Sequence, residues 1–235
     1  MPATVLLGAD PPVEVSLRRS ARARRISLRV SQLDGRVTLT LPKGVPEREA
    51  LDFAQSREGW IRDHLAGVSD RIAVNLGASV PVEGISRRLE TAPGRRVRLM
   101  PQVVQVPGVP GSVGPRLAGF LKQMARDKLA VASDDYAARL GKPYGRLTLR
   151  DTRSRWGSCS SAGNLNYAWR LILAPPEVLR YVAAHEVAHL AQMNHSPAFW
   201  RTLQDIHGPY AIPRQWLRDN GSDLHRYRFE TGVGA

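Results

Sequence analysis

The sequence predicts an α+β fold, with a smaller β-rich region over residues 1–110 followed by a more helical region over residues 111–235. Alternating apolar and polar residues are frequent in the first region, whereas apolar residues at helical spacing mark much of the second. A segment rich in proline and glycine, residues 107–115, separates the two and is the natural domain boundary. A chain of 235 residues suits one sizeable domain or two small ones.

The first region is expected to contain strands and one helix. Asp34 and Gly35 form a hairpin turn signal between two strand-like segments. Pro46 opens a helical stretch, because proline suits the first turn of a helix, and Phe53 and Trp60 recur there at helical spacing. The expected strands are residues 13–30, 36–41, 78–90 and 95–106.

The second region begins with an amphipathic helix that is expected to run from Leu117 to Leu140. Gly141 and Pro143 follow it, and both residue types commonly end helices. Two strands are then expected over residues 146–155 and 164–173, joined through a turn at residues 160–163. Pro176 suits the first turn of a further helix, and another helix is expected over residues 197–206.

The composition is that of a globular protein, with 43% hydrophobic and 23% charged residues. The sequence shows no secretory signal and no apolar stretch of the roughly 18 residues that a membrane span needs. The single cysteine, Cys159, cannot form an internal disulfide, fits a reducing compartment and is expected to be a small buried residue. We therefore expect a cytoplasmic protein that does not contact a membrane, and the oligomeric state stays open.

The positive charge of the chain is concentrated in arginine. The formal net charge is +13, with 30 Arg against 4 Lys. Ile26, Leu28 and Val30 alternate with polar residues, which is typical of a half-buried strand with a basic outer face. This face is either merely solvated or a binding surface for nucleic acid, and the sequence leaves both open. The densest cluster, with no acidic residue within it, comprises Arg18, Arg19, Arg22, Arg24, Arg25 and Arg29.

The motif His185-Glu186-Val187-Ala188-His189 points to metal chemistry. On a helix, residues four apart lie one above the other, so both imidazoles can reach one metal ion. Glu186 lies next to this pair and can reach a water molecule on the metal. Two histidines and a carboxylate in this pattern indicate a zinc hydrolase.

A third protein ligand is needed, because catalytic zinc sites use three and leave one position open. If the helix continued, His195 would point about 240° away from His189, so the chain must leave the helix between them. Asn194 tolerates the left-handed conformation that ends helices, and Pro197 resists continuation. His195 is favoured as the third ligand, and Asp205 on the following helix is the alternative.

Three further stretches accompany the histidine motif. They are residues 153–160 (RSRWGSCS), 169–176 (WRLILAPP) and 194–200 (NHSPAFW). Over about residues 150–200 the chain resembles the YgjP-like family of metal-dependent hydrolases, relatives of the SprT-like and WLM zinc peptidases. The resemblance implies a zincin-like metallopeptidase domain that binds one Zn²⁺ through His185, His189 and His195, with Glu186 as the catalytic carboxylate.

The leading hypothesis is therefore a zinc metallopeptidase acting on a peptide or protein, with Glu186 as the general base. Tyr210 is a candidate to stabilise the developing oxyanion, with His207 a weaker one, and Arg153 and Arg155 are candidates to hold a substrate carboxylate or phosphate.

Two alternative functions keep the metal. One is hydrolysis of a nucleotide or other phosphorylated substrate, and the other is a protease associated with DNA. The strand before the metal helix, residues 165–173, is either an outer strand that pairs with a substrate peptide or an internal strand.

Overall fold

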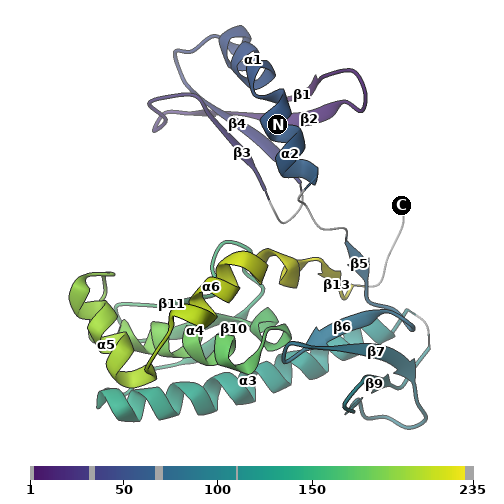
Figure 1. The fold of residues 1–235 in the computed structure, drawn as a ribbon, viewed down its shortest axis with the longest axis vertical. Coiled ribbons are helices and arrows are strands. Elements are labelled where there is room, and N and C mark those ends of the chain that lie inside the picture. The colour runs from purple at the N-terminus through teal and green to yellow at the C-terminus, as the bar shows by residue number, and fades with distance from the viewer. Residues whose placement is uncertain (1–2, 32–34, 67–70, 110, 231–235) are drawn as a thin grey trace. The chain divides into compact units, whose positions relative to one another are not determined.

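The computed structural model describes residues 3–31, 35–66, 71–109 and 111–230. The chain divides into two compact units, Met1–Asp70 and Arg71–Ala235 (Figure 1). Each unit has its own hydrophobic core. No helix of the described residues is both long enough and apolar enough to cross a membrane.

The first unit is a four-stranded sheet with two short helices. Its elements are β1 (Thr4–Leu7), β2 (Val13–Ser20), β3 (Ser27–Val30), β4 (Val37–Pro42), α1 (Glu47–Ser56) and α2 (Glu58–Ala66). The strand order is β1-β2-β4-β3, with β2 and β4 parallel and the outer pairs antiparallel. Alternate residues of β4 are buried because successive side chains face opposite sides of a sheet. Leu39 and Leu41 on the buried side share one core with Ile61 of α2.

Two features of the first unit differ from the sequence prediction. The expected strand over residues 13–30 is two strands, β2 and β3, with residues 21–26 between them. The single expected helix is two helices, because Arg57 departs from helical geometry with φ −109° and ψ 12°. Asp34 of the predicted turn lies outside the described residues, whereas Gly35 adopts φ 67° and β3 pairs antiparallel with β4 as expected.

The second unit carries the histidine motif. Its elements are β5 (Ile72–Ala73), β6 (Ser79–Val82), β7 (Ile85–Thr91), β8 (Arg98–Leu99), β9 (Val103–Val106), α3 (Val113–Leu140), β10 (Leu147–Arg150), β11 (Gly157–Cys159), β12 (Leu165–Ala168), the 3₁₀ helix η1 (Trp169–Leu173), α4 (Pro176–Ala188), α5 (Pro197–His207), α6 (Ala211–Asn220), the 3₁₀ helix η2 (Gly221–His225) and β13 (Tyr227–Arg228). The strands form three sheets, ordered β6-β7-β9-β8, β10-β12-β11 and β13-β5.

The long helix α3 organises the core of the second unit. Leu117, Leu121 and Leu129 along it are fully buried, and α3 packs against both α4 and η1. Figure 1 shows α3 beside α4. Ser133 of α3 exchanges a hydrogen bond of 3.0 Å with the hydroxyl of Tyr167 on β12, which satisfies both buried groups. Gly141 ends α3 in the left-handed conformation with φ 70°, as the sequence predicts.

The division of the chain differs from the predicted boundary at residues 110/111. The β6–β9 sheet belongs to the second unit, and its Val80, Leu89 and Val104 share one core with Leu117 and Leu121 of α3. A sheet with one apolar face needs a second layer to cover that face, and for this sheet the layer is provided in part by α3. Pro110 within the predicted boundary segment lies outside the described residues.

The predicted strand over residues 164–173 is only half a strand. Pairing ends at Ala168, and Trp169–Leu173 form η1, in which consecutive residues are buried rather than alternate ones. Arg170 of η1 forms an ion pair of 2.7 Å with Asp151 and donates a hydrogen bond of 3.0 Å to the Tyr227 carbonyl. This buried arginine therefore ties the C-terminal segment to the core. Helix α6, which follows α5, is a further element that the sequence did not predict.

Candidate metal centre

Helix α4 carries the first two histidines of the motif. Pro176 occupies its first turn, where the missing N–H of proline costs no hydrogen bond. His185 and Glu186 lie in the last turn, and the helix ends at Ala188 with His189 as its C-terminal cap. His185 and His189 are thus one turn apart, as the sequence predicts.

The chain turns after His189 in a different way from the one expected. The amide of Leu190 donates to the Val187 carbonyl at 2.9 Å, which tightens the last turn. Asn194 does not adopt the predicted left-handed conformation. Instead, its side-chain oxygen accepts a hydrogen bond of 3.2 Å from the Ser196 amide, and Ser196 caps α5. This turn returns the chain toward α4 and carries His195 with it.

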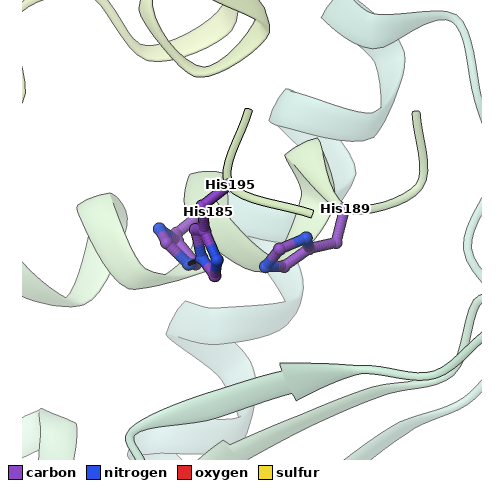
Figure 2. Close-up of side chains that lie close together, drawn as sticks. All are labelled: His185, His189 and His195. Carbon is purple, nitrogen blue, oxygen red and sulfur yellow. Dashed lines mark hydrogen bonds between the residues drawn. The ribbon is translucent and has the colours of Figure 1, made fainter. Parts of the chain in front are cut away.

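The turn brings a third imidazole to the first two. The ligand nitrogens of His185, His189 and His195 all lie within 4.8 Å of one another, and Figure 2 shows the ring of His189 pointing toward the other two. The Nε2 atoms of His185 and His195 are 3.0 Å apart. Asp205, the alternative ligand, is exposed on α5 and is not part of this group.

The spacing of two of the donor nitrogens fits a zinc ion. Two nitrogens bound to a tetrahedral zinc at about 2.0–2.1 Å lie roughly 3.3 Å apart, close to the spacing of the His185 and His195 nitrogens. The Nδ1 atom of His189 lies 2.9 Å from the Gln192 carbonyl and donates to it, so its Nε2 lone pair is left for a metal. A carbonyl partner of this kind also holds the ring in orientation.

Burial keeps two of the imidazoles neutral. It is the main cause that lowers the pKa of His185 to about 3, and His189, His195 and Arg214 lower it further. Burial also lowers the pKa of His189. Neutral imidazoles are the form that binds metal, so the site does not have to lose protons from these two rings at neutral pH.

A phenylalanine forms an apolar wall beside the three imidazoles. Phe199 of α5 is fully buried, and its ring centroid lies 4.9, 4.6 and 4.7 Å from those of His185, His189 and His195. Because Phe199 cannot accept a hydrogen bond in the ring plane, it restricts the rings without competing for their nitrogens.

Glu186 is the buried carboxyl group of the site. Its side chain is 6% exposed, and burial raises its pKa to about 8, while the Cys159 backbone amide and Arg155 act in the opposite direction. A raised pKa on a buried carboxyl group is typical of groups that transfer protons. A divalent cation on the adjacent histidines would act in the same direction as Arg155 and favour the charged carboxylate.

Glu186 lies directly against the backbone of Gly157 on β11. A Cβ atom built on Gly157 would lie 2.5 Å from Oε1 and 2.7 Å from Cδ of Glu186, which is closer than real atoms approach. Only glycine therefore allows β11 to pass this close to the carboxylate. Gly157 was not among the predicted site residues, although a glycine inside a strand is a known signal of close approach.

The strand next to the carboxylate is an outer strand. In the three-stranded sheet β12 lies between β10 and β11, so the part of the predicted segment 165–173 that forms a strand is internal. β11 pairs with β12 on one side only, among the residues that the structure describes. The edge that faces away from β12 therefore belongs to the strand that also contacts Glu186.

Tyr210 and Trp200 extend the site along α5 and α6. The Trp200 ring is half-buried and lies 5.7 Å from the His195 ring and 6.1 Å from the His185 ring. Tyr210 stacks on Trp200 at 5.5 Å, so the predicted oxyanion candidate is separated from the histidines by one aromatic ring. His207 contacts Tyr136 and Tyr181 and is not part of the histidine group.

The two predicted substrate arginines lie in different surroundings. Both are exposed, and Arg155 lines a cavity of about 360 Å³ together with Arg150 and Ser158. The positive charge of Arg155 lowers the pKa of Glu186, whereas that of Arg153 lowers the pKa of His225 and of Arg228. Arg155 is therefore the one that lies toward the site.

Cys159 behaves as the sequence suggests rather than as a nucleophile. It is half-buried, and burial together with the nearby Glu186 raises the pKa of its thiol to about 11. A thiol with this pKa is protonated at neutral pH and is a poor nucleophile.

One protein family matches most of the chain. A family model described as "YgjP-like, metallopeptidase domain" matches residues 24–220. The crystal structure of the metallopeptidase zymogen of Pyrococcus abyssi abylysin aligns with a TM-score of 0.35 at 18% identity, over 40% of this chain and 92% of that chain. A comparison with curated proteins finds no match.

Proposed function

The chain belongs to the YgjP-like metallopeptidase family, and from this premise we propose that it is a zinc-dependent metallopeptidase acting on peptide or protein substrates. The observation that carries the proposal is the group of three imidazoles, His185, His189 and His195, beside a buried glutamate. This arrangement suits one zinc ion with one coordination position left for a reactant. We place the protein in the cytoplasm, which its single cysteine favours.

Each residue of the site has a chemical role in this proposal. A zinc ion held by the three histidines would lower the pKa of a water molecule toward 7 and polarise the scissile carbonyl. Glu186 takes a proton from the attacking water and delivers it to the leaving amine. Because burial raises the pKa of Glu186, its carboxyl group can hold the proton between the two steps.

The outer strand β11 is the proposed binding edge for the substrate backbone. An extended peptide can add to an unpaired strand through main-chain hydrogen bonds, which place it in a fixed register. Because Gly157 on this strand touches Glu186, a peptide paired there would pass close to the carboxylate. Main-chain recognition of this kind does not depend on the substrate sequence.

The first test is metal content and metal-dependent cleavage. The purified chain should hold about one zinc ion and cleave an unfolded, alkylated model protein, and a chelator should remove both properties. His189→Ala should weaken zinc binding by more than about 100-fold, because even partners outside the ligand set contribute 10–100-fold. His64→Ala in the first unit is the matched control and should leave zinc content unchanged.

The same assay separates the peptidase from the alternative enzyme. Chelator-sensitive release of phosphate or pyrophosphate from nucleotides, without cleavage of the model protein, would contradict the peptidase proposal. The cavity lined by Arg150 and Arg155 is the feature that would favour such a phosphorylated substrate.

Nucleic acid is the second candidate partner, through the basic cluster of the first unit. Its six arginines, Arg18, Arg19, Arg22, Arg24, Arg25 and Arg29, are all exposed, and no described carboxylate pairs with them. Binding to such a surface should weaken as salt rises, by about 0.9 logarithmic units per phosphate contact for each tenfold change in salt.

The arginine cluster can be tested by substitution. Replacing Arg22, Arg24 and Arg25 together with glutamine should reduce this salt slope for duplex DNA by roughly 2 to 3. The matched control replaces three exposed arginines of the second unit, Arg88, Arg95 and Arg96, and should change the slope less. A wild-type chain that does not bind DNA at low salt would remove this partner.

A further inference from the structure

A partly buried arginine lies beside the histidine group. Arg214 of α6 places the carbon of its guanidinium 4.5 Å from the centroid of the Trp200 ring. That same ring lies 5.7 Å from the ring of His195 and 6.1 Å from the ring of His185. Arg214 and two of the proposed metal ligands therefore contact the same aromatic ring.

The charge of Arg214 has no acidic partner within the described part of the chain. Three other arginines of the second unit, Arg139, Arg170 and Arg180, each pair with an aspartate at 2.7 to 2.9 Å. Arg214 is half-buried, yet its guanidinium lies against an aromatic ring rather than a carboxylate. Holding a partly desolvated cation without a counter-charge is unfavourable, and a cation–π contact offsets only part of this cost.

The aromatic ring that the guanidinium contacts belongs to a stack of three rings. Tyr210 stacks on Trp200 with an interplanar angle of 24°, and Tyr181 stacks on Tyr210 with an angle of 17°. The amide of Arg214 also donates to the Tyr210 carbonyl at 3.1 Å, so the helix begins at this stack. A charged group held in place before binding loses little conformational entropy when it meets an anion.

The cavity beside β11 is also basic. Arg155, near Glu186, and Arg150 line it. A substrate that reached both this cavity and Arg214 would therefore meet positive charge at each. Acidic groups of a substrate gain from such surroundings, whereas basic groups are repelled.

We propose that Arg214 binds a carboxylate of the substrate, so that the peptidase prefers substrates with a carboxylate close to the cleaved bond. This inference rests on the proposed peptidase function and specifies its substrate class. A guanidinium pairs with a carboxylate through two parallel hydrogen bonds, which a lysine does not provide. Because an extended peptide advances about 3.3 Å per residue, the carboxylate belongs to a residue within one or two positions of that bond.

The carboxylate has two possible sources in a peptide, and matched substrates distinguish them. Cleavage sites are first mapped by mass spectrometry in an unfolded, alkylated model protein, and peptides are then made around one site. One pair exchanges an acidic residue for its amide, and a second pair exchanges a free C-terminus for an amidated one. The wild type should prefer one acidic member in kcat/KM by roughly 10- to 100-fold, the range of a charge-assisted hydrogen bond.

Charge reversal separates a binding role from a structural one. Arg214→Glu should invert the preference, so that a peptide with lysine at the same position is cleaved faster than the one with the acidic residue. Loss of packing around Trp200 would lower all rates together and would not invert the preference. Arg214→Lys keeps the positive charge but lacks the paired N–H donors of the guanidinium. It should retain only part of the preference for the acidic peptide. Arg201→Glu, on the exposed side of α5, makes the same charge change and should keep the wild-type preference.

The experiment distinguishes failure of the proposed role of Arg214 from failure of the proposed peptidase function. If the wild type cleaves no peptide, the proposed function has failed. If it cleaves peptides but ignores the acidic group, or if Arg214→Glu keeps the wild-type preference, the role of Arg214 is overturned while the peptidase stands. Zinc content measured for each variant confirms that an altered rate does not come from loss of the metal.

Discussion

Replacing Glu186 with glutamine should abolish peptide hydrolysis and leave the zinc content unchanged. Glutamine has nearly the same shape and fits the same buried space beside Gly157, but it cannot accept the proton of the attacking water. General base catalysis contributes about 10²- to 10⁴-fold, so kcat should fall by at least this factor. The measurement is single-turnover cleavage of a mapped peptide, together with zinc analysis of the same sample.

The controls for Glu186→Gln separate proton transfer from metal binding. Loss of zinc in the variant would show that Glu186 is needed to hold the metal rather than for proton transfer. Cleavage at the wild-type rate with zinc still bound would contradict the role of Glu186 as general base. Because burial raises the pKa of Glu186 to about 8, removing this ionisable group should not impair folding at neutral pH.

Gly157→Ala should cause the second large loss of activity, although residue 157 has no side chain that takes part in the reaction. The new Cβ would lie 2.5 Å from Oε1 and 2.6 Å from Cγ of Glu186, so the strand or the glutamate must move. A misplacement of about 1 Å in a reacting group can cost on the order of 10²-fold in rate. We expect a loss of this size in kcat/KM, with zinc still bound.

A second glycine provides the control for Gly157→Ala. At Gly145 an added Cβ would lie 2.7 Å from Oδ1 of Asn164, which is a similar clash but involves no residue of the site. Both substitutions should lower stability by about 1–3 kcal/mol through overpacking. Only Gly157→Ala should also reduce cleavage, and an equal loss of activity in both variants would mean that the effect comes from stability alone.

Two helix boundaries could be predicted from the sequence. Gly141 ends α3 and Pro176 begins α4 at the expected positions, because these residues act through their own backbone geometry. The strands were harder to predict. Burial of consecutive residues in η1 resembles a buried strand when only the pattern of apolar residues is read.

For the turn after α4, the sequence predicted that the chain leaves the helix but not how the turn is made. The sequence required the chain to leave the helix between His189 and His195, and it does so. The predicted left-handed residue at Asn194 is absent, and a side-chain hydrogen bond to the Ser196 amide makes the turn instead. The need for a turn follows from helical geometry, whereas its type depends on which bonds the surrounding residues make available.

The sequence by itself determined the family and the pairing of His185 with His189, because four-residue spacing on a helix is a local property. Only the tertiary structure brought His195, and not Asp205, to this pair, and only it brought Gly157 against Glu186 and Arg214 beside Trp200. Each of these contacts joins different elements, and the packing of the core sets their distances. The same holds for the unit boundary at residue 70, because only the core shared by the β6–β9 sheet and α3 shows that the Pro/Gly segment between them lies within one unit.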